Sequence, residues 1–283
     1  MSYSHDRRTF LATLGAATLT LAARRPVFST SRRRLKKVGL QLYTVREEMK
    51  KDVAKTLQRV AQIGYREVEF AGYFNHTPHE IHEMLEDYKL SAPSSHVPYP
   101  ENWDAWKKTV ADAKKVGHQY VTVAWTPEDK RKGPDAYKGV AETFNKAGTE
   151  AKKAGLQFAY HNHDYELAPV SEGVPLDILF QNTDPALVTF EMDLYWMVHG
   201  GADPLEYLKR FPGRVSLVHV KDAAGPEHTM TEVGKGSIDF PKIFAYDADH
   251  GAHIKHAFVE HDQPADPFAS IKTSFEYLKD MEY

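Results

Sequence analysis

The chain has 283 residues, of which 42% are hydrophobic and 12% aromatic, and its formal net charge is -3. This length and composition suit one large domain with a well-packed core, and an α/β barrel reaches this size as a single domain. The slightly negative charge gives no electrostatic case for nucleic-acid binding. The sequence has no cysteine, which excludes disulfides, thiolate metal sites and a cysteine nucleophile, so a transition-metal site must use His, Asp and Glu.

The N-terminal segment has the features of an export signal. Arg7 and Arg8 precede a short apolar run that ends at residue 23. This run is too short for a comfortable membrane span but fits the core of a signal peptide. The pattern resembles a twin-arginine signal, with Asp6 in place of the usual Ser or Thr and Ala12 in place of the usual Lys. The alternative interpretation is a frayed basic leader.

We therefore expect residues 1–35 to be a leader that is not part of the fold, and residues 36–283 to form one domain. A twin-arginine leader predicts that the twin-arginine translocase is a partner during export. It also predicts a periplasmic or exported protein with no membrane span in its mature form. Export by this route usually carries folded proteins, often with their cofactors, which agrees with a metalloprotein.

From residue 37 onward, short apolar, β-branched or aromatic runs alternate with helical stretches that have a polar face. The predicted strands are 38–44, 67–72, 91–96, 120–125, 156–162, 187–193, 215–221 and 256–262. One helix is expected to begin at Thr77, where Pro78 and Glu80 complete the pattern of a capped first turn. Another is expected to begin at Asp203, which Pro204 follows in the same way.

Eight strands that alternate with eight helices imply parallel pairing of the strands. At this chain length, a closed (β/α)8 TIM barrel is the economical arrangement. An open, doubly wound sheet is the alternative, but no G-x-G-x-x-G motif follows the first predicted strand.

A barrel of this kind places its active site at the carboxyl ends of its strands, and side-chain alternation predicts which residues share a face there. The pairs that share one face on the last four strands are His161 and His163, Glu191 and Asp193, His219 and Lys221, and Glu260 and Asp262. The first four strands offer Gln41, Tyr43, Glu69, His96 and Trp125. Several ionisable groups are therefore expected to converge at one end of an otherwise apolar barrel.

Such a cluster is costly, because unpaired buried charges lose their hydration. A divalent cation would neutralise it, and imidazole together with carboxylate suits Mn²⁺, Co²⁺, Zn²⁺, Fe²⁺ or Mg²⁺. Each residue also has a structural interpretation: a single histidine can be an ordinary buried one, Glu69 can pair with Arg46, and Lys221 can form a surface pair with Asp222. The recurrence of these residue types on four successive strands favours a metal site.

Seven short motifs carry a resemblance to a known family. They are GLQLYTVRE, GYREVEFAG and SSHVP on the first three strands, and YHNHDYE, FEMDLYW, HVKD and FVEHD on the last four. In this order they resemble the xylose isomerase-like TIM barrels of the sugar phosphate isomerase/epimerase group, over about residues 37–283. That family usually binds its metal through Glu, Asp, His and Glu from strands five to eight. The resemblance assigns the last three to Asp193, His219 and Glu260, and it puts His161 where the family's epimerases have a glutamate.

The resemblance implies a metal-dependent sugar isomerase or epimerase that removes a proton next to a carbonyl group. Glu260 is the leading base, and Lys221, His163 and Glu191 are candidates for the second proton-transfer role. The residues expected to bind the sugar are His96, Trp125, Glu69 and Glu191. The stretch 234–240 is expected to form a wall of the site.

Three alternatives remain open at this stage. With His161 in place of one of two facing carboxylates, a dehydratase or lyase of a keto-sugar, inosose or 3-keto-glycoside needs only one base. A metal-dependent nuclease like endonuclease IV needs a histidine three residues after the strand-six aspartate, where this chain has Trp196. A non-catalytic sugar-binding barrel is the third alternative.

The substrate is expected to be a small neutral sugar or keto-derivative. The only weak candidate for a phosphate cradle is the GKG segment at 234–236. The sequence leaves the formation of a homo-oligomer open.

Overall fold

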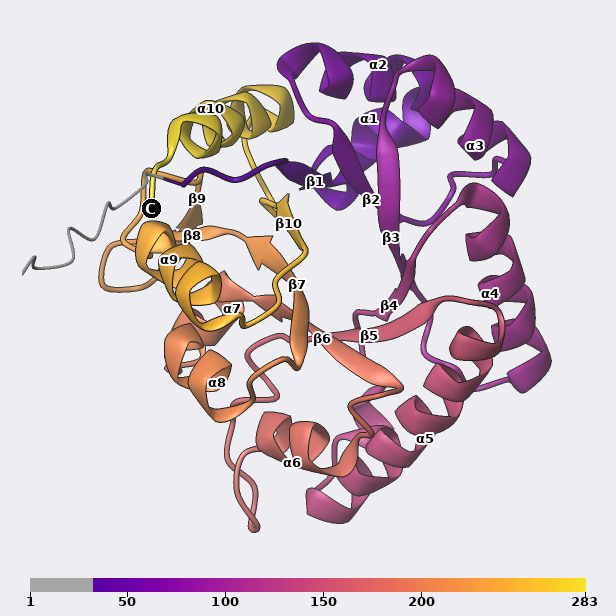
Figure 1. Cartoon of the computed structure of the whole chain (residues 1–283), viewed down its shortest axis with the longest axis vertical. Helices are drawn as coiled ribbons and strands as arrows, with labels where there is room; N and C mark the ends of the chain where they lie inside the picture. Colours follow the sequence, from indigo (N-terminus) through magenta and orange to yellow (C-terminus); the bar gives the residue numbers. More distant parts are fainter. Residues whose placement is uncertain (1–32) are drawn as a thin grey trace, which may run out of the picture. The chain divides into compact units, whose positions relative to one another are not determined.

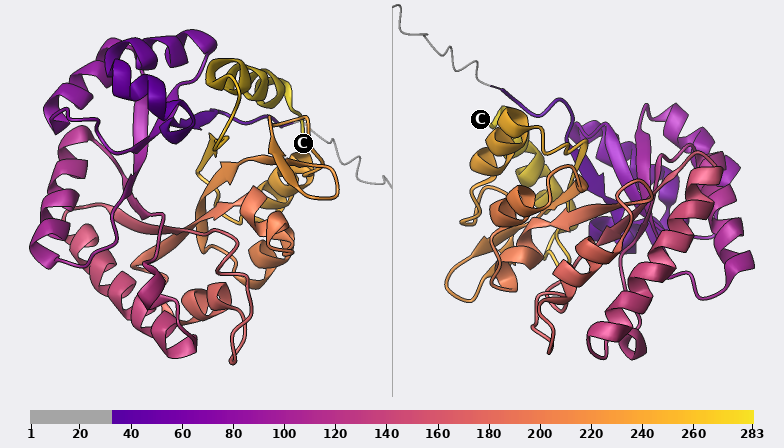
Figure 2. Two further views of the ribbon diagram at one scale, coloured as in Figure 1. Left: turned by 180° about the vertical axis from the view of Figure 1, so that it is seen from behind. Right: turned by 60° about the horizontal axis from the view of Figure 1, so that its bottom comes forward.

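The computed structural model of the chain describes residues 33–283. The predicted leader lies outside these described residues, apart from its last three positions. In the described part, eight parallel strands close into a barrel with the order β1-β10-β7-β6-β5-β4-β3-β2. Helices surround this barrel (Figure 1; the reverse side and a tilted view are in Figure 2). The predicted (β/α)8 TIM barrel is therefore confirmed.

The barrel strands are β1 (Gly39–Gln41), β2 (Glu67–Ala71), β3 (Ser91–Val97), β4 (Tyr120–Val123), β5 (Gln157–His161), β6 (Val188–Asp193), β7 (Val215–Val220) and β10 (His256–Val259). All eight correspond to predicted strands, but several end earlier than the sequence pattern indicated. β1 ends at Gln41 because its side-chain oxygen accepts a hydrogen bond from the Tyr43 N–H (3.0 Å), which begins the 3-10 helix η1 (Leu42–Val45). β10 ends before Glu260, so that residue and Asp262 belong to a loop.

The helices are α1 (Arg46–Lys51), α2 (Val53–Ile63), α3 (Pro78–Asp87), α4 (Trp103–Val116), α5 (Pro134–Lys153), α6 (Pro175–Asn182), α7 (Leu194–His199), α8 (Pro204–Arg210), α9 (Phe240–His250) and α10 (Pro267–Asp280), with a second 3-10 helix η2 (Glu128–Lys130). The predicted cap of α3 is present: the Glu80 N–H donates to the Thr77 hydroxyl (3.3 Å), and the Thr77 N–H donates to the Glu80 carboxylate (2.7 Å). Asp203 caps α8 as expected, accepting from the Leu205 N–H (2.9 Å).

A short antiparallel hairpin of β8 (Asp222–Ala224) and β9 (Thr229–Thr231) follows β7. The buried Asp222 carboxylate accepts hydrogen bonds from the N–H groups of Gly234 (2.9 Å), Gly236 (3.0 Å) and Ile238 (3.2 Å). A Cβ atom at Gly236 would collide with this carboxylate, so a glycine is required there. Two amides of the GKG segment, those of Gly234 and Gly236, therefore bind a carboxylate of the protein itself, and the Lys235 N–H donates to the Glu232 backbone oxygen.

A small cluster of paired side chains lies at the amino ends of the strands. The buried Glu67 carboxylate accepts hydrogen bonds from Lys37 (3.0 Å) and is paired with His256 (3.0 Å). Beside it, Arg33 and Tyr283 exchange backbone hydrogen bonds of 2.9 and 3.0 Å, so the first and last described residues lie side by side.

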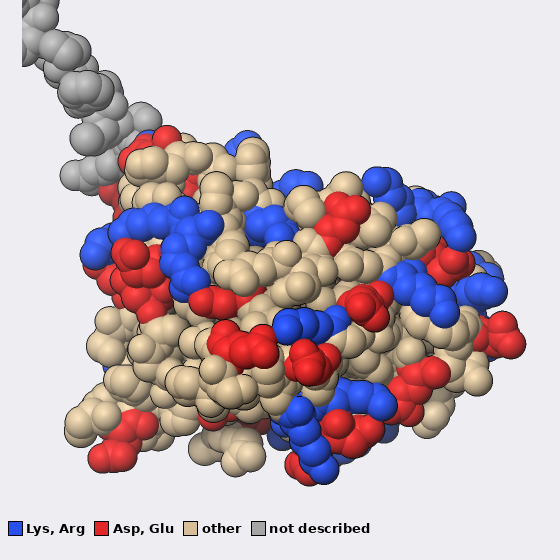
Figure 3. Space-filling view, turned by 90° about the horizontal axis from the view of Figure 1, so that it is seen from below, with Lys and Arg blue, Asp and Glu red and all other residues tan. Residues whose placement is uncertain are grey.

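The surface carries charges of both signs, and acidic and basic side chains are interspersed on the face that Figure 3 shows. Many are paired along helices, for example Lys50 with Glu47 and Lys209 with Glu206, both at 2.7 Å. Among the described helices, none is both long and apolar enough to cross a membrane.

Candidate functional site

A cleft of about 370 Å³ opens at the carboxyl ends of the barrel strands. Its lining consists of Tyr43, Arg46, His96, Ala124, Trp125, His161, His163, Lys221, Glu260, Asp262 and Gln263. A larger cavity of about 660 Å³ lies at the amino ends, around Lys37, Glu67 and His256. We assign the site to the smaller cleft, because ionisable groups from many strands converge there and because barrels of this class act at that end.

The predicted site residues separate into two groups by depth. His96, Trp125, His161, His163, Lys221 and Glu260 line the cleft. Glu69, Glu191, Asp193 and His219 are fully buried beneath it, with no exposed surface. None of residues 234–240 lines the cleft, contrary to expectation, because the Asp222 carboxylate holds that loop elsewhere.

The upper part of the buried cluster joins strands β6 and β7 to the loop after β10. Asp193, His219 and Glu260 each offer one ligand atom, and these atoms all lie within 4.8 Å of one another. The His219 Nδ1 atom is 2.8 Å from Glu260 Oε2 and 3.8 Å from Asp193 Oδ2. His161 on β5 adds its Nε2 atom, 3.7 Å from Asp193 Oδ2. These four residues are the predicted metal-ligating set, and the structure brings them together.

Lys221 extends its ammonium group into the same region. Its Nζ atom lies 3.0 Å from Asp193, 2.7 Å from Glu260 and 2.9 Å from Asp262. Lys221 is 2% exposed, so the alternative that it forms a surface pair with Asp222 is wrong. Asp262 is more exposed than the other two carboxylates and holds Lys221 from the open side of the cleft.

A second carboxylate layer lies below these ligand atoms. The Glu69 carboxylate accepts hydrogen bonds from Gln41 (2.7 Å) and Ser94 (2.5 Å), and it is 2.7 Å from His219 Nε2. Its partners do not include Arg46, which donates instead to two backbone carbonyls. Glu69 therefore contacts Nε2 of His219, whereas Nδ1 of the same ring faces Glu260.

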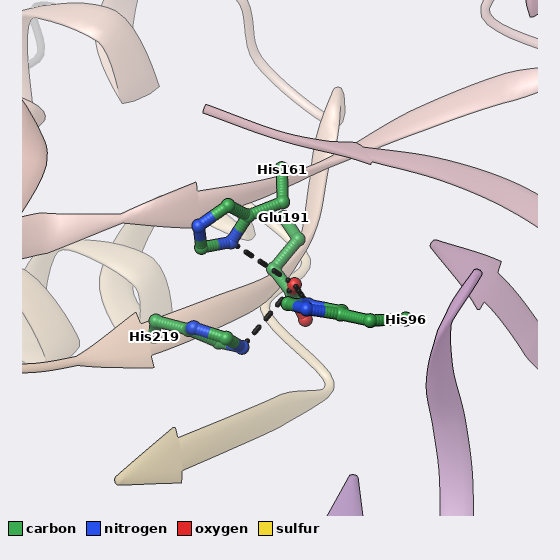
Figure 4. Close-up of side chains that lie close together, drawn as sticks. All are labelled: His96, His161, Glu191 and His219. Atoms are coloured by element: carbon green, nitrogen blue, oxygen red, sulfur yellow. Dashed lines mark hydrogen bonds and ion pairs between the residues drawn. The ribbon is translucent and has the colours of Figure 1, made fainter. Parts of the chain in front are cut away.

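Glu191 makes the equivalent contact with His161. Its Oε2 atom lies 3.2 Å from His161 Nδ1, 2.7 Å from His96 Nε2 and 3.2 Å from His219 Nε2. Figure 4 shows the three imidazole rings arranged around this one carboxylate. When one ring nitrogen of a histidine binds a metal, a carboxylate commonly binds the other ring nitrogen. That contact fixes the tautomer and the orientation of the ring.

The cluster contains more buried negative than permanent positive charge. Four buried carboxylates, those of Glu69, Glu191, Asp193 and Glu260, face one buried ammonium group, that of Lys221. Such an excess is stable only if histidines or carboxylates take up protons or if a cation binds.

The pKa values of Asp193, Glu260 and Lys221 reflect this excess of buried carboxylates. Burial raises the pKa of Asp193 to about 6, although Lys221 opposes the shift. Burial acts in the same direction on Glu260, but Lys221 and His219 hold the pKa of that carboxyl well below its usual range. The pKa of Lys221 lies well above its ordinary value, because Asp193 and Glu260 outweigh its burial. Glu260 and Lys221 are therefore both charged at neutral pH.

The histidines of the cluster differ in the direction of their pKa shifts. Burial holds the pKa of His161 well below its ordinary value and lowers that of His163 to about 3, so both rings are neutral at pH 7. Burial also opposes the charging of His219, but Glu191 and Glu260 raise its pKa well above the ordinary value. Neutral imidazole is the form that binds a metal, so His161 already has this form and His219 would release its proton on metal binding.

Three buried polar atoms of the cluster region have no hydrogen-bond partner: Glu191 Oε1, Asp193 Oδ2 and His163 Nδ1. The Asp193 oxygen has only ionic contacts, with Lys221 (3.0 Å), His161 (3.7 Å) and His219 (3.8 Å). Buried polar atoms are rarely left without a partner. Unused oxygen and nitrogen donors within a set of His, Asp and Glu fit a divalent metal, and the fit does not distinguish Mn²⁺, Co²⁺, Zn²⁺, Fe²⁺ or Mg²⁺.

Sequence reasoning missed several residues that shape the site. Ser94, which binds Glu69, lies in the SSHVP motif, but a serine at that position does not reveal this contact. Arg131, behind Trp125, lies in no recognisable motif. Asp222 was expected only in a surface pair with Lys221, because its contacts with amides 12 to 16 positions later depend on the path of that loop.

The fold and the cluster together define a TIM barrel with a buried His and carboxylate site that fits a divalent metal. The sequence profile of the xylose isomerase-like TIM barrel matches residues 57–281. The chain therefore belongs to the xylose isomerase-like TIM barrel family, and its structural relatives include sugar phosphate isomerase/epimerases.

Three relatives illustrate this membership. An inosose dehydratase of Geobacillus kaustophilus (strain HTA426) is 24% identical over 274 residues, covering 79% of this chain and 85% of that protein. The crystal structure of a sugar phosphate isomerase/epimerase from Parabacteroides distasonis ATCC 8503 has a TM-score of 0.76 and 31% identity, covering 87% of this chain and 98% of the other. The IOLI protein with a bound zinc atom has a TM-score of 0.64 and 15% identity over 85% of this chain and 95% of that one, a likeness of fold.

Proposed function

We propose that this protein is a metal-dependent enzyme that removes a proton next to the carbonyl group of a sugar or keto-sugar. The observation that carries the proposal is the convergence of Asp193, His219, Glu260 and His161 at the floor of one cleft. These four residues would hold the metal. A divalent ion bound there would supply Lewis-acid polarisation of a carbonyl or hydroxyl oxygen. Zinc in the IOLI structure agrees with a metal in this barrel.

The lower carboxylates would orient the metal-binding histidines. We propose that Glu69 holds His219 and Glu191 holds His161 by accepting a hydrogen bond from the far ring nitrogen. Neither carboxylate lines the cleft, so we favour this role over the direct binding of sugar that the sequence suggested.

Glu260 is our proposed base, and Lys221 our proposed proton donor. Glu260 lies in the cleft lining and is ionised, so it can accept a proton from a carbon held above it. The Lys221 ammonium lies 2.7 Å from it and can donate to an oxygen that becomes negative or leaves. Asp262 keeps Lys221 paired from the solvent side when Glu260 accepts the proton.

We favour elimination over symmetrical epimerisation, because the two walls of the cleft differ. One wall carries Glu260 and Lys221, whereas the other carries the neutral imidazoles of His161 and His163. One ionised carboxylate as base and one ammonium group as acid suit a dehydratase or lyase, and the relative named inosose dehydratase agrees with this. Epimerisation is the second candidate, with His163 as the opposing base, and the isomerase/epimerase name of the Parabacteroides relative favours it.

A neutral sugar is the substrate class that we propose. The GKG amides are already bound by Asp222, so they offer no phosphate cradle. Trp125 presents a partly exposed ring to the cleft, which suits the apolar face of a sugar. The nuclease alternative is disfavoured by Trp196 at the position where a metal-binding histidine is required.

We also propose export through the twin-arginine route, on the basis of Arg7 and Arg8. Changing both to lysine should keep a reporter fusion in the cytoplasm. A reporter that is exported equally well without the pair would contradict this route.

The decisive experiment is incubation of the metal-loaded protein with a panel of keto-sugars in D₂O, with metal analysis of the purified protein alongside. We expect about one divalent ion per chain and deuterium at the carbon next to the carbonyl. Product NMR then separates the two reactions, because elimination removes an oxygen substituent and epimerisation keeps all of them. A protein without metal that gives neither exchange nor product would be the sugar-binding alternative.

A further inference from the structure

The rim of the cleft carries two aromatic rings that the buried cluster does not use. Trp125 is 52% exposed and Tyr43 is 42% exposed, and within residues 33–283 no other large hydrophobic side chain is classed as exposed. Both rings line the cleft. Keeping two aromatic rings in water is unfavourable, so their shared location at the cleft indicates a ligand that covers them.

The Tyr43 ring is held in place from behind. The Arg46 guanidinium lies 4.1 Å from the centre of the ring. Its Nη1 atom donates to the backbone oxygens of Tyr43 and Asp262, both at 2.8 Å. The arginine therefore bridges η1 and the loop after β10, and it covers one face of the ring before any ligand binds.

The Trp125 ring, which follows β4, is also stacked on an arginine. The Arg131 guanidinium lies 3.8 Å from the centre of this ring and 3.6 Å from that of Tyr165. Its Nε atom donates to the backbone oxygen of Thr126 (2.6 Å). Each exposed ring thus has one face stacked on a fixed arginine, and ring contacts with His163 (5.8 Å between centres) tie Trp125 to the cleft.

The two rings stand on different sides of the cleft. Tyr43 follows β1 and Trp125 follows β4, with β2 and β3 between them in the barrel wall. Neighbouring strands are about 4.8 Å apart, so the wall between the two strand ends measures roughly 14 Å. A single sugar ring is shorter than this stretch of wall.

We propose that Tyr43 and Trp125 form a two-ring binding subsite, so that the substrate is a sugar that carries a second ring, either aryl or glycosyl. The sugar ring stacks on Trp125, and the second ring stacks on Tyr43. Tyr43 lies on the side of Lys221, because Arg46 binds the backbone of Asp262, whose carboxylate accepts from Lys221 (2.9 Å). This inference rests on the proposed function and extends it by naming the residues that select the size of the substrate.

The test measures binding of three sugars that have no keto group to the metal-loaded full chain by titration calorimetry. The probes are methyl β-glucoside with one ring, and phenyl β-glucoside and cellobiose with two. We expect the two-ring probes to bind about three- to tenfold more tightly, as one additional ring stack provides. Tyr43→Ala should remove this preference and leave methyl β-glucoside unaffected, whereas Trp125→Ala should weaken all three probes about three- to tenfold.

Trp103→Ala is the matched control, because the Trp103 ring is stacked on Lys146 (3.7 Å) on the outer helices and does not line the cleft. It should leave all three affinities unchanged. Metal content should be the same in every variant. Size-exclusion chromatography tests the competing role of the rings: if Tyr43→Ala or Trp125→Ala alters the oligomeric state, the rings cover a protein contact and the proposal fails.

Equal affinity of the wild-type protein for one-ring and two-ring probes would overturn the subsite, as would a preference that survives Tyr43→Ala. These binding measurements require no turnover. A protein that shows the ring preference but neither metal nor deuterium exchange would reject the proposed reaction alone. A protein that exchanges deuterium without any ring preference would reject the subsite alone.

Discussion

Both ends of the barrel bury a glutamate beside a histidine, but only one end has balanced charges. At the amino end, the two Glu67 oxygens have separate partners, Lys37 and His256, each at 3.0 Å. At the carboxyl end, Glu191 Oε1 has no hydrogen-bond donor, and Asp193 Oδ2 has ionic contacts but no hydrogen bond. The same residue types therefore make a closed structural pair at one end and an incomplete site at the other.

The difference shows that burial of a charged residue does not by itself indicate function. What distinguishes the carboxyl end is the excess of carboxylates over cations and the presence of unused donor atoms next to a cleft. In a structural cluster the charged groups pair with one another, whereas in a ligand site some charged or polar groups are paired only when the ligand binds.

The largest expected effect comes from Asp193→Ala. This change removes a metal-binding oxygen and leaves Lys221 and His219 without one of their carboxylates, so metal content and activity should both fall to background. Elemental analysis and turnover of the responsive keto-sugar measure the two effects. Glu67→Gln at the other end is the control and should keep its metal. Full activity in metal-free protein would contradict the site.

Glu260→Gln should lower turnover by about 10² or more, because the shape is retained and the base is lost. Lys221 keeps Asp193 and Asp262 as partners in this variant, so folding should not be affected. Entry of solvent deuterium into the substrate should stop. Deuterium exchange at the wild-type rate would show that Glu260 is not the base, and Lys221 or His163 would then be tested in its place.

Glu191→Ala should weaken metal binding by about 10- to 100-fold, because His161 loses the acceptor that orients it. Glu191→Gln keeps a side-chain oxygen in the same place and should recover part of the affinity. A competition titration with a metal-binding dye gives the affinity, and the visible absorption of the Co²⁺ form reports the ligand geometry. Unchanged affinity in the alanine variant would mean that Glu191 has no orienting role.

The smallest effect is expected at the amino end, where Glu67→Gln should lower the free energy of unfolding by about 1–3 kcal/mol at pH 7. Burial opposes ionisation of Glu67, but hydrogen bonds from His256 and Lys37 hold its pKa below the ordinary value of 4.5. A lowered pKa adds stability above pH 4.5 that is lost as the pH falls through the folded-state value. Urea unfolding should therefore show the difference at pH 7 and a smaller one below pH 4.

Much of the fold could be predicted, because eight β-branched and aromatic runs with clear helix caps leave few arrangements at this length. The facing of Asp193 and His219 followed from alternation. Depth could not be predicted in this way, because alternation says which side of a strand a residue occupies but not how far below the barrel mouth it lies. Glu69 and Glu191 were therefore expected in the cleft, although both are fully buried.

The path of the loop at residues 234–240 is the second feature that the sequence did not predict. The stretch 234–240 was expected to form a wall of the site, and its glycines were read as a weak phosphate cradle. The acceptor for those amides is Asp222, which lies 12 to 16 positions earlier in the chain. Contacts of this kind depend on the path of the loop in space, which local sequence preferences do not determine.

The pairing of Arg33 with Tyr283 gives the protein a natural attachment point. Both residues line the cavity at the amino ends of the strands, whereas the cleft opens at the carboxyl ends. A linker or affinity handle joined to Tyr283 therefore emerges on the side away from the cleft. Immobilised through this residue on a bead or a sensor chip, the barrel presents its open mouth to the flowing sugar solution.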